Sequence, residues 1–167
     1  MLRYSCFFQI ILLSYISQLM KRKFLTKNST QTKKLAEKLA IKILQEKKRE
    51  KAFVIGLEGE LGAGKTTFLQ GFAKGLSIKE RILSPTFILM RRFSLKGGRN
   101  FYHLDCYRIA KAKEVLDLGF KDIILGPQNI VAVEWAGKIK EILPKNALRI
   151  KVRVIGDKER EVSVSSW

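Results

Sequence analysis

Two continuous apolar runs stand out along the chain and predict its central strands. They read Ala-Phe-Val-Ile-Gly-Leu at residues 52–57 and Ile-Val-Ala-Val at residues 130–133, and an acid and a tryptophan follow the second run. A run that lacks the alternation of a half-exposed strand is typical of a parallel strand buried on both faces. We therefore predict buried parallel strands over residues 52–58 and 130–135.

Between residues 28 and 48 the apolar positions follow a helical period instead. Asn28 and Ser29 carry side-chain oxygens that can cap the N-terminus of a helix. One buried stripe follows, formed by Leu35, Ala36, Leu39, Ala40, Ile43 and Leu44. The opposite side is rich in lysine, a pattern that favours a solvated face over a face that binds nucleic acid.

Gly97 and Gly98 separate two strand-like segments and predict a β-hairpin after the helix that begins near residue 65. On its second strand, residues 100–108, alternation places Phe101, His103, Asp105 and Tyr107 on one face. Shorter patterns predict an edge strand at residues 24–25, helices over 114–118 and 136–143, and final strands over 147–155 and around 162–164. The strand over 147–155 alternates with its apolar residues facing inward, namely Leu148, Ile150, Val152 and Val154.

Composition adds little to this picture. The 167 residues suffice for one α/β domain, and 46% hydrophobic residues is ordinary for a globular protein. The net charge of +18 makes an acidic or nucleic-acid partner worth considering, but the lysines are scattered and form no single basic block. Cys6 and Cys106 lack the spacing of a disulfide framework or a zinc site, which suits a reducing cytosol.

The first residues differ from the rest. Residues 1–19 are mostly apolar, but polar residues interrupt them and no small-x-small cleavage site follows. Met20, which precedes Lys-Arg-Lys-Phe-Leu-Thr, is a plausible start of the domain. We expect residues 1–19 to be a non-domain extension from a misassigned start site and residues 20–167 to form the domain. The alternative for 1–19 is a membrane-associating helix.

The strongest chemical signal is a glycine-rich segment between the first apolar run and a helix. Residues 59–66 read Gly-Glu-Leu-Gly-Ala-Gly-Lys-Thr and match the pattern of a phosphate-binding loop (P-loop) in its strand–loop–helix context. In such a loop successive N–H groups point at one phosphate and the helix N-terminus adds positive potential. Lys65 would reach the β- and γ-phosphates of a nucleotide, and the Thr66 hydroxyl would hold Mg²⁺.

Two carboxylates and one loop could complete the site. Glu134 ends a buried strand, which is the Walker B arrangement, and Asp105 ends the second strand of the hairpin. One acid would hold the metal and the other would orient a water, and the residue types do not decide which. Ser84-Pro85-Thr86 lies where many such folds place a switch segment. An N-K-x-D stretch is absent, which favours ATP over GTP.

These motifs together resemble the TsaE (YjeE-type) family of P-loop ATPases of bacterial tRNA threonylcarbamoyladenosine (t6A) biosynthesis. The resemblance rests on four segments in order: residues 59–68, Ser-Pro-Thr-Phe at 84–87, His-Leu-Asp-Cys-Tyr-Arg at 103–108 and Val-Glu-Trp-Ala at 133–136. It implies a single P-loop NTPase domain with a mixed, mostly parallel sheet between helices. It also implies a cytoplasmic ATPase without a membrane segment.

The resemblance also implies partners and residue roles. The ATPase would act with the subunits TsaB and TsaD, meet tRNA only through their complex, and reset or regulate the transferase. Mg²⁺ would be held by Thr66 and Glu134 or Asp105, and catalysis would involve Asp105, Glu134 and Lys65. The residues implied to bind ATP are Leu61, Gly62, Ala63, Gly64, Lys65, Thr66, Thr67, Thr86, Trp135 and Arg160 (with Lys158 as the alternative to Arg160). Residues 30–32 would border the adenine.

Two other functions are compatible with a phosphate loop. One is a small-molecule kinase on the same fold, although no arginine-rich lid follows the loop's helix. The other is a nucleic-acid-binding module that uses the basic surface.

Overall fold

The structure is a computed structural model that describes residues 22–46, 49–85 and 88–167. The predicted extension over 1–19 and the switch residue Thr86 lie outside these ranges. The elements of the described ranges are β1 (Arg22–Thr26), α2 (Ser29–Leu44), β2 (Phe53–Glu58), α3 (Lys65–Gly75), β3 (Met90–Ser94), η1 (Lys96–Gly98), β4 (Asn100–Asp105), α4 (Ala112–Asp117), α5 (Phe120–Leu125), β5 (Asn129–Glu134), η2 (Ala136–Ile142), β6 (Leu148–Val154) and β7 (Arg160–Ser166).

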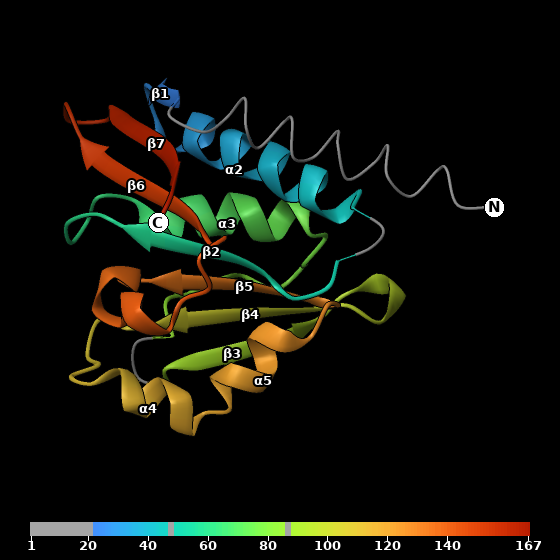
Figure 1. The fold of residues 1–167 in the computed structure, drawn as a ribbon. Coiled ribbons are helices and arrows are strands. Elements are labelled where there is room, and N and C mark those ends of the chain that lie inside the picture. The colour runs from blue at the N-terminus through green and yellow to red at the C-terminus, as the bar shows by residue number, and fades with distance from the viewer. Residues whose placement is uncertain (1–21, 47–48, 86–87) are drawn as a thin grey trace.

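The strands form one sheet in the order β1-β7-β6-β2-β5-β4-β3 (Figure 1). β2 pairs in parallel with β5 and β6, and β4 pairs in parallel with β5, whereas β1–β7, β6–β7 and β3–β4 are antiparallel. The predicted mixed sheet and the hairpin after α3 are therefore confirmed, but the sheet is not mostly parallel, because both edges are built from antiparallel pairs and the two kinds of pairing are equally represented. The two buried runs of the sequence, β2 and β5, are neighbours at its centre.

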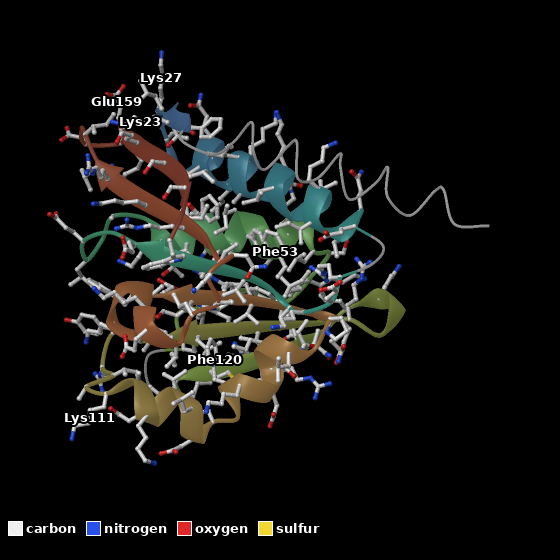
Figure 2. All side chains as sticks on the ribbon, in the orientation of Figure 1. Lys23, Lys27, Phe53, Lys111, Phe120 and Glu159 are labelled. Atoms are coloured by element: carbon white, nitrogen blue, oxygen red, sulfur yellow. The ribbon has the colours of Figure 1, made fainter. Side chains whose placement is uncertain are left out.

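Apolar side chains cover both faces of the sheet, giving three layers. α2 and α3 pack on one face through residues such as Leu39 and Phe72. α4, α5 and η2 pack on the other, where Phe120 is fully buried beneath the sheet and Lys111 is exposed (Figure 2). None of the helices in the described ranges has both the length and the apolar character needed to cross a bilayer.

Three predicted segments differ in detail. α2 ends at Leu44, whereas the sequence predicts that it reaches residue 48. At this end of the helix the Arg99 guanidinium, from the hairpin, donates to the carbonyl oxygens of Leu44 (2.6 Å) and Glu46 (2.9 Å). The segment predicted as a helix over 136–143 is a 3₁₀ helix, broken by a non-helical backbone at Ile139. Val154, predicted to face inward, is 48% exposed because it lies at the end of β6, beyond the buried part of the strand.

Helices α2 and α3 approach each other closely at Gly71. A Cβ atom at this position would lie 2.1 Å from the carbonyl oxygen and 2.4 Å from the Cα of Lys33. Both of these atoms belong to the backbone of α2, so a side chain at Gly71 would force the two helices apart.

We expect Gly71→Ala to lower the free energy of unfolding by about 1–3 kcal/mol, the usual cost of overpacking, despite the higher helix propensity of alanine. Urea unfolding followed by circular dichroism measures this difference. Lys38→Ala, at an exposed position of α2, is the control and should be nearly neutral. A Gly71→Ala protein as stable as the wild type would contradict the close packing.

Candidate nucleotide-binding site

The loop between β2 and α3 opens onto a cavity of about 410 Å³. Gly64 has a φ of +107°, a value that disfavours residues with a side chain, and immediately precedes α3. The first N–H groups of α3 have no partner within the helix and carry its positive end. The side chains and backbone around this cavity are Leu61, Gly62, Gly64, Lys65, Thr66, Thr67, Ser84, Asp105, Tyr107, Glu134 and Trp135.

Lys65 is folded back against its own loop. Its Nζ donates to the carbonyl oxygens of Gly59 and Glu60, each at 2.8 Å, and lies 3.9 Å from the centroid of the Trp135 ring. Burial lowers the pKa of Lys65, and the carboxylates of Glu134 and Asp105 partly oppose this shift. Two carbonyl dipoles and an aromatic face thus hold the ammonium group at the cavity wall.

Glu134 and Thr66 meet at one side of the cavity. The Thr66 hydroxyl donates to the carboxylate of Glu134, at 3.2 Å from Oε1 and 3.1 Å from Oε2. Glu134 ends β5 and is only 2% exposed, and its neighbour across the sheet is Leu57, close to the end of β2. The parallel pairing of β2 and β5 therefore brings the acid to the start of α3, although the two residues lie far apart in the sequence.

Asp105 is the partner of Glu134 in the next parallel pairing, between β4 and β5. Its Oδ1 accepts a hydrogen bond from the backbone N–H of Tyr107 at 2.9 Å, and its Oδ2 accepts one from the Ser84 hydroxyl. Asp105 is 3% exposed. The two acids predicted from the sequence are thus side by side, one bonded to the phosphate loop and the other to the segment that begins at Ser84.

Trp135 follows Glu134 in a left-handed conformation, with φ +58° and ψ +35°. Such a backbone is rare for a bulky residue and is found at turns and functional sites. Its ring lies 5.1 Å from that of Tyr107, measured between centroids. Lys138 donates to the carbonyl oxygens of Tyr107 and Ile109, which ties the loop after β4 to η2.

Two predicted binding residues lie outside the cavity lining. Ala63 is buried, and its carbonyl oxygen accepts a hydrogen bond from Nε of Arg160 at 3.0 Å. Arg160 also donates to the carbonyl oxygens of Gly156, Asp157 and Glu159. In this structure Arg160 therefore holds the outer side of the phosphate loop. A third predicted binding residue, Thr86, falls outside the described ranges.

The cavity also involves residues other than the predicted binding and catalytic side chains. Ser84 and Tyr107 line it, and His103, fully buried, has its Nε2 2.9 Å from Oε1 of Glu134. Alternation over the predicted strand 100–108 places His103 and Asp105 on one face, whereas the observed strand β4 ends at Asp105 and Tyr107 lies in the turn that follows. That signal was available, but only the pairing with β5 makes Glu134 the partner of His103.

Cys106 directly follows β4 and is 1% exposed. Burial, reinforced by the nearby Asp105 carboxylate, raises the pKa of its thiol to about 12, and Lys138 opposes the shift only partly. Because the thiolate is the reactive form, we expect Cys106 to resist iodoacetamide at pH 8 in the native protein and to react after denaturation. Mass spectrometry of the peptide that contains Cys106 distinguishes these results, and rapid native alkylation would contradict the buried position.

The residues around Thr66 suit Mg²⁺. This ion prefers oxygen ligands, takes few from the protein and shares the rest with phosphates and water. The Thr66 hydroxyl and the Glu134 carboxylate are such ligands, and they are already within hydrogen-bond distance of each other.

Comparisons with known proteins identify the family of this chain. Residues 26–162 match the family model "Threonylcarbamoyl adenosine biosynthesis protein TsaE". The tRNA threonylcarbamoyladenosine biosynthesis protein TsaE of Bacillus subtilis is 43% identical over 68% of this chain and 69% of its own length, and that of Treponema pallidum is 37% identical over 70% and 84%. The crystal structure of Bacillus subtilis YdiB superposes with a TM-score of 0.69 at 36% identity, over 87% of this chain and 85% of YdiB. The chain, with its P-loop ATPase fold, belongs to the TsaE family.

Proposed function

We propose that this protein is the ATP-binding and ATP-hydrolysing subunit required for threonylcarbamoylation of adenosine 37 in tRNA. In this proposal it is cytoplasmic and acts with TsaB and TsaD, as a regulator or resetting ATPase of the transferase. The observation that carries the proposal is the contact between Thr66 of the phosphate loop and Glu134, with Asp105 beside Glu134 in the sheet. Its relatives are named for t6A biosynthesis, which supports the assignment to this pathway.

In the proposed complex the segment from Leu61 to Thr67 wraps the phosphates of ATP. The Lys65 ammonium group leaves the carbonyl oxygens of Gly59 and Glu60 and binds the β- and γ-phosphates, whose charge replaces the two dipoles. Trp135 lies at the edge of the nucleotide. Arg160 supports the phosphate loop indirectly, by donating to the Ala63 carbonyl oxygen. It would reach a phosphate only by giving up its hydrogen bonds to backbone carbonyl oxygens.

The contacts of the two acids favour one assignment of the two roles, magnesium ligand and water-orienting residue, which the residue types left open. Glu134, which already accepts from Thr66, would hold the magnesium ion with that hydroxyl. Asp105 would orient and polarise the attacking water, because it lines the cavity beside Glu134 and accepts hydrogen bonds from Tyr107 and Ser84. When bound, Mg²⁺ neutralises charge on the phosphate oxygens. Ser84 begins the predicted switch segment. Its hydrogen bond to Asp105 would therefore couple the orientation of this carboxylate to the position of the segment.

Incubation with ATP labelled at the γ-phosphate, with and without a pool of small metabolites, tests the reaction class. The proposal predicts free phosphate in both cases, whereas labelled metabolite in place of free phosphate would support a kinase.

Co-purification tests the proposed partners. The full-length protein should associate with TsaB and TsaD in the presence of ATP, and Lys65→Ala should weaken that association. If the isolated protein instead binds tRNA tightly, with an affinity that falls steeply as salt rises, that result would support the alternative of a nucleic-acid-binding module.

A further inference from the structure

His103 is the only histidine of the chain and lies fully buried on β4, beside the central strand β5. Its Nε2 lies 2.9 Å from Oε1 of Glu134, and its buried Nδ1 has no hydrogen-bond partner among the described residues. A carboxylate can only accept, so the proton belongs on Nε2, which then donates to Glu134. Nδ1 is left as a bare acceptor, which is a better-tolerated state for a buried nitrogen than an unpaired N–H donor.

The direction of the imidazole ring is set by its surroundings. His103 belongs to β4, whose register with β5 pairs it with Ala132, and its ring stacks on Phe101 with an interplanar angle of 18°. The carboxylate of Glu134 has no such constraint of its own, because the last torsion of a glutamate is broad and roughly two-fold. A donor on a rigid strand can therefore fix how this carboxylate is turned.

The two oxygens of Glu134 have different neighbours. Oε1 is near both His103 and Thr66, whereas Oε2 is near Thr66 alone among the described hydrogen bonds. If the imidazole retains Oε1, then Oε2 is the oxygen that faces the Thr66 hydroxyl. These two atoms are the ones that the proposed function assigns to the metal of the bound nucleotide.

We propose that His103 is a positioning residue for magnesium binding. Its Nε2–H holds Oε1 of Glu134 and turns Oε2 toward the site shared with Thr66. Groups that orient a ligand in this way commonly contribute 10–100-fold to metal affinity or activity. The inference rests on the proposed role of Glu134, but it concerns a different side chain and can fail separately.

The first test compares His103→Leu, which removes the donor, with His103→Gln, whose side-chain amide places an N–H near the position of Nε2. ATP affinity is measured by calorimetry with Mg²⁺ and with EDTA. For His103→Leu we expect the gain in affinity from Mg²⁺ to fall by roughly 10–100-fold, with the affinity in EDTA unchanged, and for His103→Gln most of the gain to remain. Asn129→Ala is the matched control, because it removes side-chain hydrogen bonds with Ile123 and Asn100 at the far end of β5.

The possible outcomes separate the two claims. A wild-type protein whose ATP affinity does not depend on Mg²⁺ would contradict the proposed magnesium site itself. A dependence that is present in the wild type and intact in His103→Leu would overturn the role of His103 alone.

A second test needs no substitution and remains decisive if His103→Leu does not fold. A single histidine gives one pair of ring-nitrogen NMR signals, without ambiguity of assignment. We expect a protonated Nε2 and a bare Nδ1, and a shift of the Nε2 signal when Mg²⁺ is added to the ATP-bound protein. Protonation of Nδ1 alone, or ring signals that do not respond to Mg²⁺, would contradict the inference.

Discussion

Replacement of Lys65 by alanine is expected to abolish measurable nucleotide binding. The ammonium group is the one lysine charge that lines the described cavity, and in the complex it would bond to two phosphates. Hydrogen bonds to charged groups contribute about 1.5–3 kcal/mol each, so their loss should weaken affinity by more than ~100-fold. Calorimetric titration with ATP in the presence of Mg²⁺ measures this change.

Lys74→Ala provides the matched control for Lys65→Ala. Lys74 lies on the same helix, but its side chain is 72% exposed and pairs with Glu37 on the surface. Its removal should leave ATP affinity unchanged. Near wild-type affinity in Lys65→Ala, with the fold intact by circular dichroism, would refute the assigned role of the phosphate loop.

Asp105→Asn is expected to separate binding from hydrolysis. Asparagine is nearly isosteric and can still accept from the Tyr107 N–H, so the local structure should persist. It lacks the negative charge needed to polarise a water, and loss of a general base typically costs 10²–10⁴-fold in rate. ATP affinity should remain close to that of the wild type. Single-turnover phosphate release, measured beside calorimetry, gives both quantities.

The matched control for this change is Asp117→Asn on α4. Asp117 is an exposed acid paired with Lys113, at 61% side-chain exposure, and it should affect neither quantity. Unaltered turnover in Asp105→Asn would show that Asp105 does not orient the water. Loss of binding together with turnover would instead assign Asp105 to the nucleotide or its metal.

The parts of the site that follow from local pattern were predictable. Residues 59–66 combine glycines, a lysine and a threonine between an apolar strand and a helix, and that order alone defines a phosphate loop. Glu134 was predictable because a buried strand that ends in an acid must bring it to the carboxyl edge of a parallel sheet. Neither inference needs a contact between distant residues.

Contacts between distant segments were beyond the reach of these patterns. The bond from His103 to Glu134 depends on the register of β4 against β5, which no feature of either strand specifies alone. The position of Arg160 behind Ala63 depends in the same way on the register of β7, which lies between β6 and β1 and pairs with both. The contact of the Lys65 ammonium group with the Trp135 ring likewise depends on the pairing of β2 with β5.

The central claim is that the nucleotide site of this protein supports t6A formation, and the t6A content of tRNA tests it most directly. The protein is depleted in its own cells, and nucleosides from total tRNA are quantified by mass spectrometry. We predict that t6A falls on depletion, returns with the full-length wild-type chain and does not return with Lys65→Ala. Undiminished t6A after depletion, or full restoration by Lys65→Ala, would contradict the account.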